Sequence, residues 1–335
     1  MKAWVKHPLI YEINTWVWLR ELGLKYRKSV DLATVPEQEW DAIAANGLDA
    51  VWFMGVWERS PAGIGVSMQN AGLIEDFRRA LPDFSAGDNV GSPYCVRRYA
   101  VDEHLGGPQG LAAARSMLRE RGLRLILDFV PNHVAPDHPW VRDHPEYFVQ
   151  GNADVARKDP ASFIEAYGKV FACGRDPYFP AWPDVLQLNA FQPGLRQAVI
   201  ETVSNIAAQC DGIRCDMAML MLNNIFERTW GDCAGVKPVN DYWTTVIPAI
   251  KKECRSSGSL PRHTGTLSGS CSSRVLTTAT TRNSTTGWNM TLPRACGCIS
   301  LQTLLIRSGW SGSSRTTTSR EPLPHFLMQK GAPPL

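Results

Sequence analysis

The chain opens with a regular alternation of short apolar runs and helical segments. Four of the runs are rich in β-branched and aromatic residues, as buried parallel strands are. They are residues 9–16, 48–54, 124–130 and 212–217. Two segments between them predict helices: residues 108–121 begin with Pro108 and end before Gly122, and residues 193–209 begin with Pro193. The alternation predicts an α/β fold with a parallel sheet, either open or closed into a barrel.

Two parts of the chain lack this alternation. Residues 134–190, between the third and fourth predicted strands, are rich in Pro, Asp and aromatic residues, and so long a loop in a compact domain usually carries function. Residues 255–274 and 307–335 show neither helical nor strand periodicity, and in this last part of the chain only residues 299–306 could form an element. We therefore predict that residues 255–335 have no fixed structure.

Composition and charge change at the same point. The whole chain of 335 residues is 44% apolar and 20% charged with a net charge of +3, as in ordinary soluble globular proteins. Residues 255–335 hold nine Lys and Arg against a single acidic residue, Glu321, and 27 Ser and Thr; their charge of +8 leaves −5 for the rest. A basic tail is typical of nucleic-acid binding, but aromatic and basic residues do not interleave here, so we expect no nucleic-acid partner.

The lack of a recognisable targeting signal and the pattern of cysteines bear on the cellular compartment. The N-terminal residues MKAWVKHPLIYEI lack the apolar run and the small-residue cleavage site of a secretory signal. No stretch reaches the roughly 18 apolar residues that span a membrane. The nine cysteines are an odd number without CxxC pairs, so we interpret them as free thiols. These features predict a cytoplasmic protein with no membrane partner.

Polar residues gather at the ends of two predicted strands. One strand carries Asp128 and is followed by Asn132 and His133, and another ends with Arg214 and Asp216, which share a face because they are two residues apart. In a β/α barrel, the carboxyl ends of the strands carry the catalytic side chains. A structural alternative is a buried ion pair between Asp128 and Arg214 that only stabilises the barrel.

Several ordered segments resemble one family. DFVPNH (residues 128–133) and GIRCDMAM (212–219) resemble two successive signatures of the α-amylase family of glycoside hydrolases. GSPYCVRRYAVDEHLGG (91–107) resembles the segment that precedes the first signature, and YEINTW (11–16) resembles the opening strand. The resemblance covers roughly residues 9–254.

This resemblance implies a (β/α)8 TIM barrel with a subdomain inserted in the loop after the third strand. The chain would supply about four barrel strands, so the barrel is expected to be incomplete. Residues 1–133 would form its first part, residues 134–190 the inserted subdomain, and residues 191–254 the continuation, with residues 255–335 as a non-native tail.

The family chemistry that the resemblance implies is retaining double displacement on the α-glucosidic bonds of malto-oligosaccharides or related α-glucosides. Asp216 matches the nucleophile and Arg214 the residue that keeps it ionised, since a neighbouring guanidinium lowers the pKa of a carboxylate. Asp128 and His133 match groups around the sugar in the cleavage subsite. Tyr94 matches the aromatic platform on which that sugar stacks.

Two further positions concern a metal and the neighbouring sugar. Asn132 matches a position that binds calcium in many members, although no Asp-rich calcium loop is visible. We therefore expect no required cofactor, with calcium as an option. Met219 and Leu220 stand where other members place the Lys and His that bind the next sugar, which leaves recognition of that sugar open.

The second carboxyl of a retaining mechanism is missing from the sequence. This general acid, about 5 Å from the nucleophile, follows the fifth strand in the family, and a third carboxylate lies in an Asn-His-Asp signature. Neither occurs in residues 255–335. In the frame that starts one nucleotide earlier, residues 261–266 can be decoded as A-E-A-Y-W-D and residues 315–321 as E-N-H-D-E-P-R, which resemble those motifs. We predict a frameshift near Cys254, from a sequencing error or a real mutation.

Three functional alternatives share these residues. Hydrolysis, transglycosylation and isomerisation use the same motifs, so an oligosaccharide substrate is expected in each case. The polypeptide as written could instead be an inactive half-barrel that binds sugar weakly or fails to fold. After an active enzyme and an inactive half-barrel, the third option is a sugar-binding protein that never was an enzyme. The paired signatures argue against it.

Overall fold

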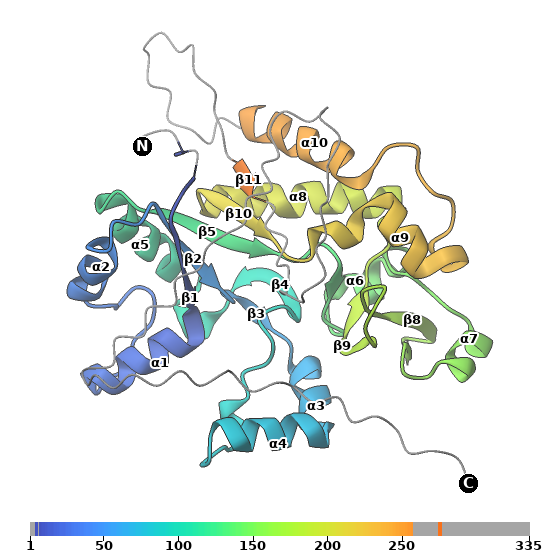
Figure 1. Cartoon of the computed structure of the whole chain (residues 1–335), viewed down its shortest axis with the longest axis horizontal. Coiled ribbons are helices and arrows are strands. Elements are labelled where there is room, and N and C mark those ends of the chain that lie inside the picture. The colour runs from blue at the N-terminus through green and yellow to red at the C-terminus, as the bar shows by residue number, and fades with distance from the viewer. Residues whose placement is uncertain (1–3, 6, 257–273, 277–335) are drawn as a thin grey trace, which may run out of the picture.

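The computed structural model describes residues 4–5, 7–256 and 274–276 (Figure 1). Its centre is a parallel sheet of five strands. In order across the sheet they are β1 (Ile10–Asn14), β2 (Ala50–Met54), β5 (Arg124–Phe129), β10 (Gly212–Cys215) and β11 (Arg274–Leu276). The described strands form an open sheet rather than a closed ring, so the prediction of an incomplete barrel is confirmed.

Both faces of this sheet are apolar, which explains the continuous apolar runs in the sequence. Val51, Leu125 and Ile213 point to one face and join the main core. Their neighbours in the strands point to the opposite face, where Ala50 and Ile126 belong to a second, smaller cluster. In a β/α barrel the first face packs on the helices and the second face lines the barrel interior.

Six helices accompany the strands along the chain. They are α1 (Thr15–Tyr26), α2 (Glu37–Ala44), α5 (Gly107–Glu120), α8 (Pro193–Gln209), α9 (Asn223–Trp230) and α10 (Tyr242–Ser256). Leu111 and Leu118 of α5, and Leu195 and Val199 of α8, are buried in the main core, as the periodicity of both segments predicted. None of the described helices has the length and apolar character needed to cross a lipid bilayer.

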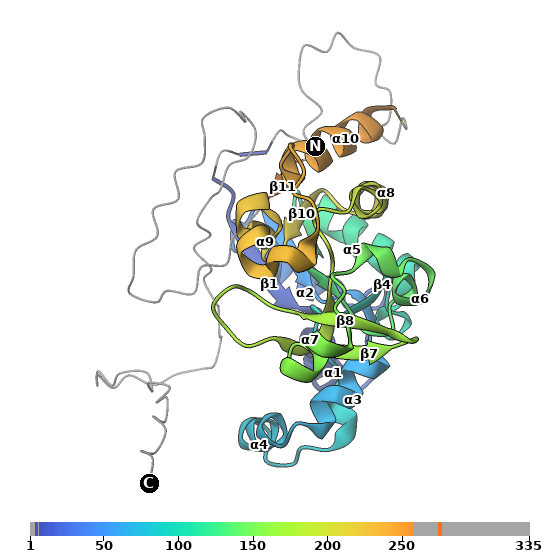
Figure 2. The same ribbon diagram turned by 90° about the vertical axis from the view of Figure 1, so that its right-hand side faces the viewer.

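A first insertion lies between β2 and α5. The strands β3 (Trp57–Arg59) and β4 (Val96–Val101) pair antiparallel, and the helices α3 (Pro61–Gln69) and α4 (Ala71–Ala80) lie between them in sequence. Both views place α3 and α4 at one end of the molecule, away from the central sheet (Figures 1 and 2). The sequence patterns did not predict these elements, because α4 has no buried residue and β3 spans only three residues.

A second insertion follows β5, where the sequence predicted a long loop. It contains an antiparallel sheet and two short helices. The strand order is β6 (His133–Val134), β9 (Trp182–Gln187), β8 (Lys169–Gly174) and β7 (Phe163–Ala166), and the helices are α6 (Pro139–Asp143) and α7 (Ala153–Lys158). The loop interpretation is therefore wrong at the level of elements: β6 and β7 have only two and four residues, and Pro183 and Asp184 interrupt the apolar run of β9. An inserted subdomain after the third barrel strand was predicted; its limits at residues 134 and 190 stay a prediction.

The expected absence of structure after residue 254 also differs from the structure at two points. Helix α10 continues to Ser256, and Arg274–Leu276 form β11, which pairs with β10. An edge strand such as β10 presents N–H and C=O groups that a short apolar segment can pair with. The possible element at residues 299–306, and the rest of the predicted tail, lie outside the described residues.

Candidate functional site

Three charged side chains meet at the carboxyl ends of β5 and β10. The strand register places Arg214 opposite Asp128, and the backbone N–H of Asp216 donates to the carbonyl of Phe129 at 2.8 Å. Asp128, Arg214 and Asp216 are only 2%, 5% and 7% exposed. The structure therefore brings together three of the residues that the sequence selected, in a water-poor position at the end of the sheet.

One guanidinium serves two carboxylates. Nη1 of Arg214 lies 3.1 Å from Oδ1 of Asp128, and Nη2 lies 2.9 Å from Oδ1 of Asp216. The other oxygen of Asp128 accepts a hydrogen bond of 3.0 Å from Nε1 of Trp52. The Asp128–Arg214 ion pair of the structural alternative is present, but it shares its cation with Asp216.

Aromatic rings enclose the cation of this cluster. Cζ of Arg214 lies 4.5 Å from the ring centre of Trp52 and 5.4 Å from that of Tyr94, distances at which a cation and a π-face attract each other. Arg214 also donates a hydrogen bond of 3.2 Å to the Tyr94 hydroxyl, which in turn donates to the sulfur of Met54 at 3.3 Å. Tyr94 is half-buried, so it lies beside the cluster rather than in a distant loop.

Burial has the largest effect on the pKa values of the two aspartates in this cluster. It raises the pKa of Asp128 to about 7, although Arg214 and the Trp52 hydrogen bond oppose the change. Burial also raises the pKa of Asp216, again against the effect of Arg214. The sequence argument predicted a lowered pKa for Asp216; Arg214 does act in that direction, but desolvation outweighs it. One cation beside two buried carboxylates leaves a net negative charge, so the two carboxylates compete for it.

His133 lies at the start of β6, against Tyr94. A hydrogen bond with the Tyr94 backbone favours its charged form, but burial dominates and lowers the pKa of His133 to about 4. Its ring packs edge-on against Trp182, with ring centres 5.3 Å apart. His133 is therefore a neutral imidazole at pH 7, beside the residues of the cluster.

Asn132 faces a side-chain amide rather than an open metal site. Its Oδ1 accepts from Nε2 of Gln187 at 2.9 Å, and its Nδ2 donates to Oε1 of Gln187 at 3.2 Å. Both residues are fully buried. Within the described ranges, no group of three or more His, Cys, Asp or Glu side chains could hold a metal ion. Among the described residues, Asn132 and its surroundings do not fit a calcium site, because the Asn132 oxygen already accepts from Gln187 and no carboxylate set lies around it there.

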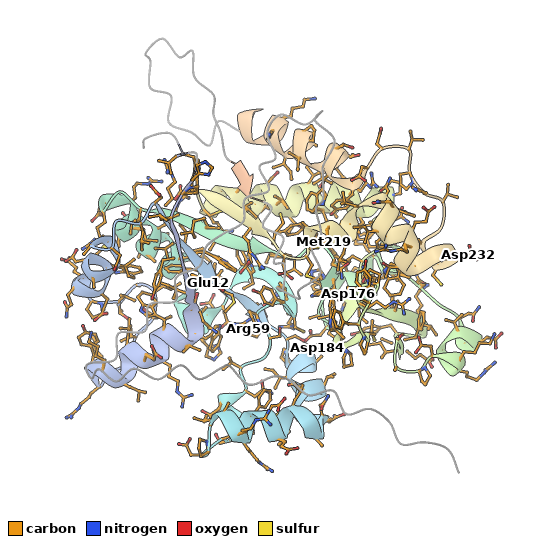
Figure 3. All side chains as sticks on the ribbon, viewed as in Figure 1. Glu12, Arg59, Asp176, Asp184, Met219 and Asp232 are labelled. Carbon is orange, nitrogen blue, oxygen red and sulfur yellow. The ribbon has the colours of Figure 1, made fainter. Side chains whose placement is uncertain are left out.

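The residues after Asp216 form a tight turn. Met217 has a φ of 47°, a left-handed conformation, and Ala218–Met221 form a single turn of 3-10 helix. Met219 is half-buried and Leu220 is 5% exposed. Figure 3 labels Met219 between the sheet and α9. The chain thus places apolar side chains after Asp216, as the sequence indicated.

Sequence reasoning missed Trp52, Met54 and Glu12. Trp52 is the hydrogen-bond donor to Asp128, and Met54 accepts from Tyr94. Glu12 lies opposite Trp52 in the β1–β2 register, and burial raises its pKa while the charge of Arg214 lowers it. The signal was available in the strand alternation, which puts Trp52 and Met54 on the same face of the sheet as Asp128.

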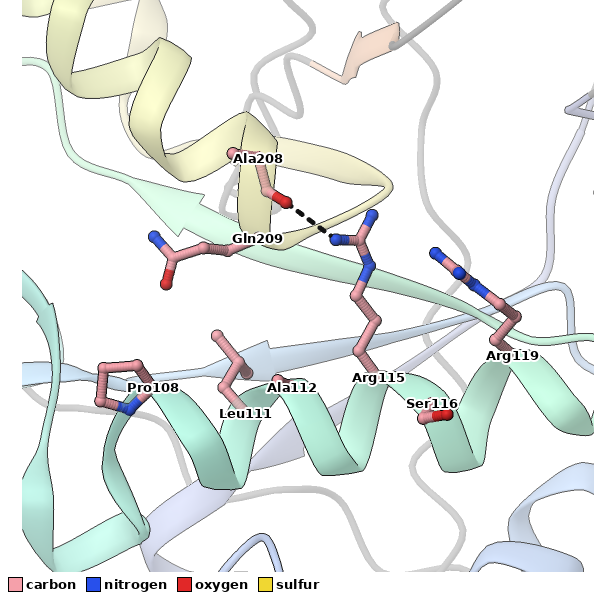
Figure 4. Close-up of a pocket in the computed structure, with 8 residues that line it drawn as sticks. All are labelled: Pro108, Leu111, Ala112, Arg115, Ser116, Arg119, Ala208 and Gln209. Carbon is pink, nitrogen blue, oxygen red and sulfur yellow. Dashed lines mark hydrogen bonds between the residues drawn. The ribbon is translucent and has the colours of Figure 1, made fainter. Parts of the chain in front are cut away.

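A pocket lies on the outer side of the sheet, between α5 and α8 (Figure 4). Its lining includes Arg115, whose Nη1 donates to the carbonyl of Ala208 at 2.9 Å and whose Nη2 pairs with Asp211 at 2.7 Å. These contacts join α5 to the end of α8. The pocket lies on the helices, apart from the strand ends that carry Asp128 and Asp216.

Comparison with known proteins identifies the family of this chain. The family described as alpha amylase, catalytic domain, matches residues 45–246. Alpha-amylase MalA of Haloarcula japonica is 24% identical over 231 residues, which cover 69% of this chain and 28% of that protein. An alpha-1,4-glucan:maltose-1-phosphate maltosyltransferase of Cereibacter sphaeroides is 37% identical over 100 residues, 28% of this chain and 15% of that protein.

The fold has solved counterparts as well. The structure of a family GH13_31 enzyme aligns with a TM-score of 0.51 at 16% identity, and the alignment covers 83% of this chain and 48% of that one. The chain thus spans less than half of this structure and less than a third of the Haloarcula relative. The family match extends over more than half of the chain and includes Asp128, Arg214 and Asp216, and on this ground the chain belongs to the α-amylase family.

Proposed function

We propose that this chain carries the nucleophile of a retaining enzyme that acts on α-glucosidic bonds, with malto-oligosaccharides or related α-glucosides as substrates. The observation that carries the proposal is the position of Asp216, a buried carboxylate at a strand end with Arg214 at 2.9 Å. A nucleophilic carboxylate must be ionised near pH 7, and the guanidinium supplies the charge that favours this form.

The reaction would proceed by two displacements. A carboxylate oxygen of Asp216 bonds to the anomeric carbon while the bond to the leaving oxygen breaks, and a general acid protonates that oxygen. The same general acid, now a base, then removes a proton from water as the water displaces Asp216. Two inversions at one carbon give retained configuration.

Asp128, His133 and Tyr94 would hold the reacting sugar. Asp128 is fixed by Arg214 and Trp52, so it offers a positioned carboxyl group to sugar hydroxyls. His133, with a pKa of about 4, is neutral and can donate one hydrogen bond without adding charge. The half-buried ring of Tyr94 provides the apolar face on which a pyranose stacks.

In this proposal, the codons for the general acid lie in a reading frame other than the one that gives residues 255–335. The frameshift near Cys254 predicted from the sequence would restore an acidic motif from residues 261–266 and an Asn-His-Asp motif from residues 315–321. Resequencing the gene from codon 250 onward tests this step. An unaltered sequence would contradict the frameshift and leave the assignment of Asp216 in place.

The missing general acid determines what activity we expect of the chain as written. The chain as written is expected to be inactive, because loss of the general acid typically costs on the order of 10² to 10⁴ in rate.

The second candidate activity is glycosyl transfer, which the similarity to a maltosyltransferase over 100 residues supports. Transfer and hydrolysis differ only in whether a sugar hydroxyl or water attacks the covalent intermediate.

The test uses a chain with the reading frame restored near codon 254. Incubated with a malto-oligosaccharide, it is expected to release product whose first-formed anomer, followed by NMR, is α. Asp216→Asn is expected to abolish this release, and Asp143→Asn, a change at an exposed aspartate, serves as the matched control. First-formed β-anomer would contradict the retaining mechanism.

A further inference from the structure

Arg59, at the end of β3, is a buried cation without an ionic partner among the described residues. It is 8% exposed, and its Nε and Nη1 atoms have no hydrogen-bond partner. Among the described residues, Asp102 has the largest favourable charge effect on Arg59, but that carboxylate receives the backbone N–H of Arg59 at 3.4 Å and lies 2.9 Å from the ring of His104. The guanidinium therefore keeps donors that point to no acceptor in the described part of the chain.

A second unused donor lies beside it. Nε1 of Trp16 is buried and has no partner in the described residues, and Cζ of Arg59 lies 5.7 Å from the Trp16 ring centre. Trp16 is in the first turn of α1, which contains no acidic residue. Three nitrogen donors, Nε and Nη1 of Arg59 and Nε1 of Trp16, thus lack an acceptor among the described residues, although Arg59 and the Trp16 ring lie side by side.

This place adjoins the proposed sugar site. Gly55 has a φ of +80°, and a Cβ there would lie 2.5 Å from Nη2 of Arg59 and 3.0 Å from Cβ of Pro93. The guanidinium therefore packs over Gly55, next to the residue that precedes Tyr94. Met54, the neighbour of Gly55, accepts the hydrogen bond from the Tyr94 hydroxyl. Figure 3 labels Arg59 at β3.

The unpaired donors of Arg59 favour the binding of a hydrogen-bond acceptor. A buried guanidinium that lacks a partner is costly, and its planar array of N–H groups matches the two oxygens of a carboxylate or phosphate. Burial lowers the pKa of Arg59 to about 10, which leaves it charged at pH 7. Water could satisfy single donors, but a bound anion would add to the partial charge compensation that Asp102 and Asp128 supply.

We propose that Arg59 and Nε1 of Trp16 bind an oxyanion, a phosphate ester or a carboxylate, carried by the sugar substrate next to Tyr94. The inference rests on the proposed function, because it identifies the substrate as an anionic α-glucoside. It goes further, since the proposed function assigns no role to either residue.

The test is a binding titration of the full chain at constant ionic strength, with calorimetry as the measurement. The probes are glucose, glucose 1-phosphate, glucose 6-phosphate, glucuronate and inorganic phosphate. We expect at least one anionic sugar to bind about 10-fold more tightly than glucose. Arg59→Met should remove that preference, Trp16→Phe should reduce it several-fold, and Arg119→Met, at an exposed arginine of α5, should leave it unchanged.

The outcomes separate this inference from the proposed function. Equal affinity for glucose and for every anionic sugar in the unaltered chain would overturn it without any variant. Arg59-dependent binding of inorganic phosphate with no gain from the sugar would also overturn it, because the oxyanion would not belong to the substrate. Asp216→Asn should keep the preference, so a failure of the catalytic assignment leaves the titration informative.

Discussion

Arg214 reaches Asp216 across 2.9 Å while its other terminal nitrogen contacts Asp128 at 3.1 Å. This geometry gives one positive charge to two buried carboxylates. The chemistry proposed for Asp216 requires the ionised form, and the same burial that excludes water raises its pKa. Arg214 is therefore the group on which the ionisation of the proposed nucleophile depends.

Replacing Arg214 tests this dependence. In the frame-restored chain, Arg214→Met should raise the pKa of Asp216 further and move the acid limb of the kcat/KM profile to higher pH. We expect the rate to fall by about 10²-fold or more, as when a preorganised charge is removed from an active site. Arg142→Met, at an exposed arginine, is the control. An unmoved acid limb would show that Arg214 does not set the ionisation.

Trp52 provides a second test, because its indole N–H donates to Asp128 at 3.0 Å. Trp52→Phe keeps an aromatic face beside Arg214 and removes only this hydrogen bond. Loss of a hydrogen bond to a buried charged group costs about 1.5–3 kcal/mol. We expect denaturant unfolding to report a loss of this size and NMR titration to report a higher pKa for Asp128. An unchanged Asp128 titration would contradict the assigned contact.

Tyr94 has two separable contributions. Tyr94→Phe removes the hydroxyl that accepts from Arg214 and donates to Met54, but it keeps the ring. Tyr94→Ala removes both. If the ring is the sugar platform, we expect KM of the frame-restored enzyme to rise about 10-fold or more only in the alanine variant, since loss of the buried apolar face costs about 1.5–3 kcal/mol. Equal KM values for the two variants would argue against stacking.

Much of the central sheet could be predicted because buried parallel strands are nearly continuous apolar runs. The insertions could not, since strands such as His133–Val134 are too short to show alternation. The site was only partly accessible for a different reason. Asp128 and Arg214 follow from strand register, but the pairing of Asn132 with Gln187 joins positions 55 residues apart, and local sequence carries no signal for it.

His138 predicts a loss of stability in acid. Its Nδ1 accepts from the backbone N–H of Trp140 at the start of α6, and burial lowers its pKa to about 4 from the ordinary 6.5. The folded state therefore binds fewer protons than the unfolded state between those values, so stability falls as pH decreases from about 6.5 to about 4. The full contribution is about 3 kcal/mol.

Urea unfolding across this pH range measures the effect. His138→Asn retains a side-chain oxygen for the helix cap and removes the titrating ring, so its stability should depend less steeply on pH. The remaining slope would come from groups such as His133, whose pKa is lowered in the same way. His144→Asn, at an exposed histidine, is the control. Parallel curves for His138→Asn and the unaltered chain would contradict the prediction.

The most direct measurement concerns the covalent intermediate on Asp216. The frame-restored chain is incubated with a fluorinated α-glucosyl fluoride, which slows breakdown of the glycosyl ester, and is then analysed by peptide mass spectrometry. The anomeric fluoride leaves, and the account predicts one added fluoroglucosyl group on the peptide that contains Asp216, and none in Asp216→Asn. A label on a different carboxylate such as Asp128, or turnover of an α-glucoside by Asp216→Asn, would contradict it.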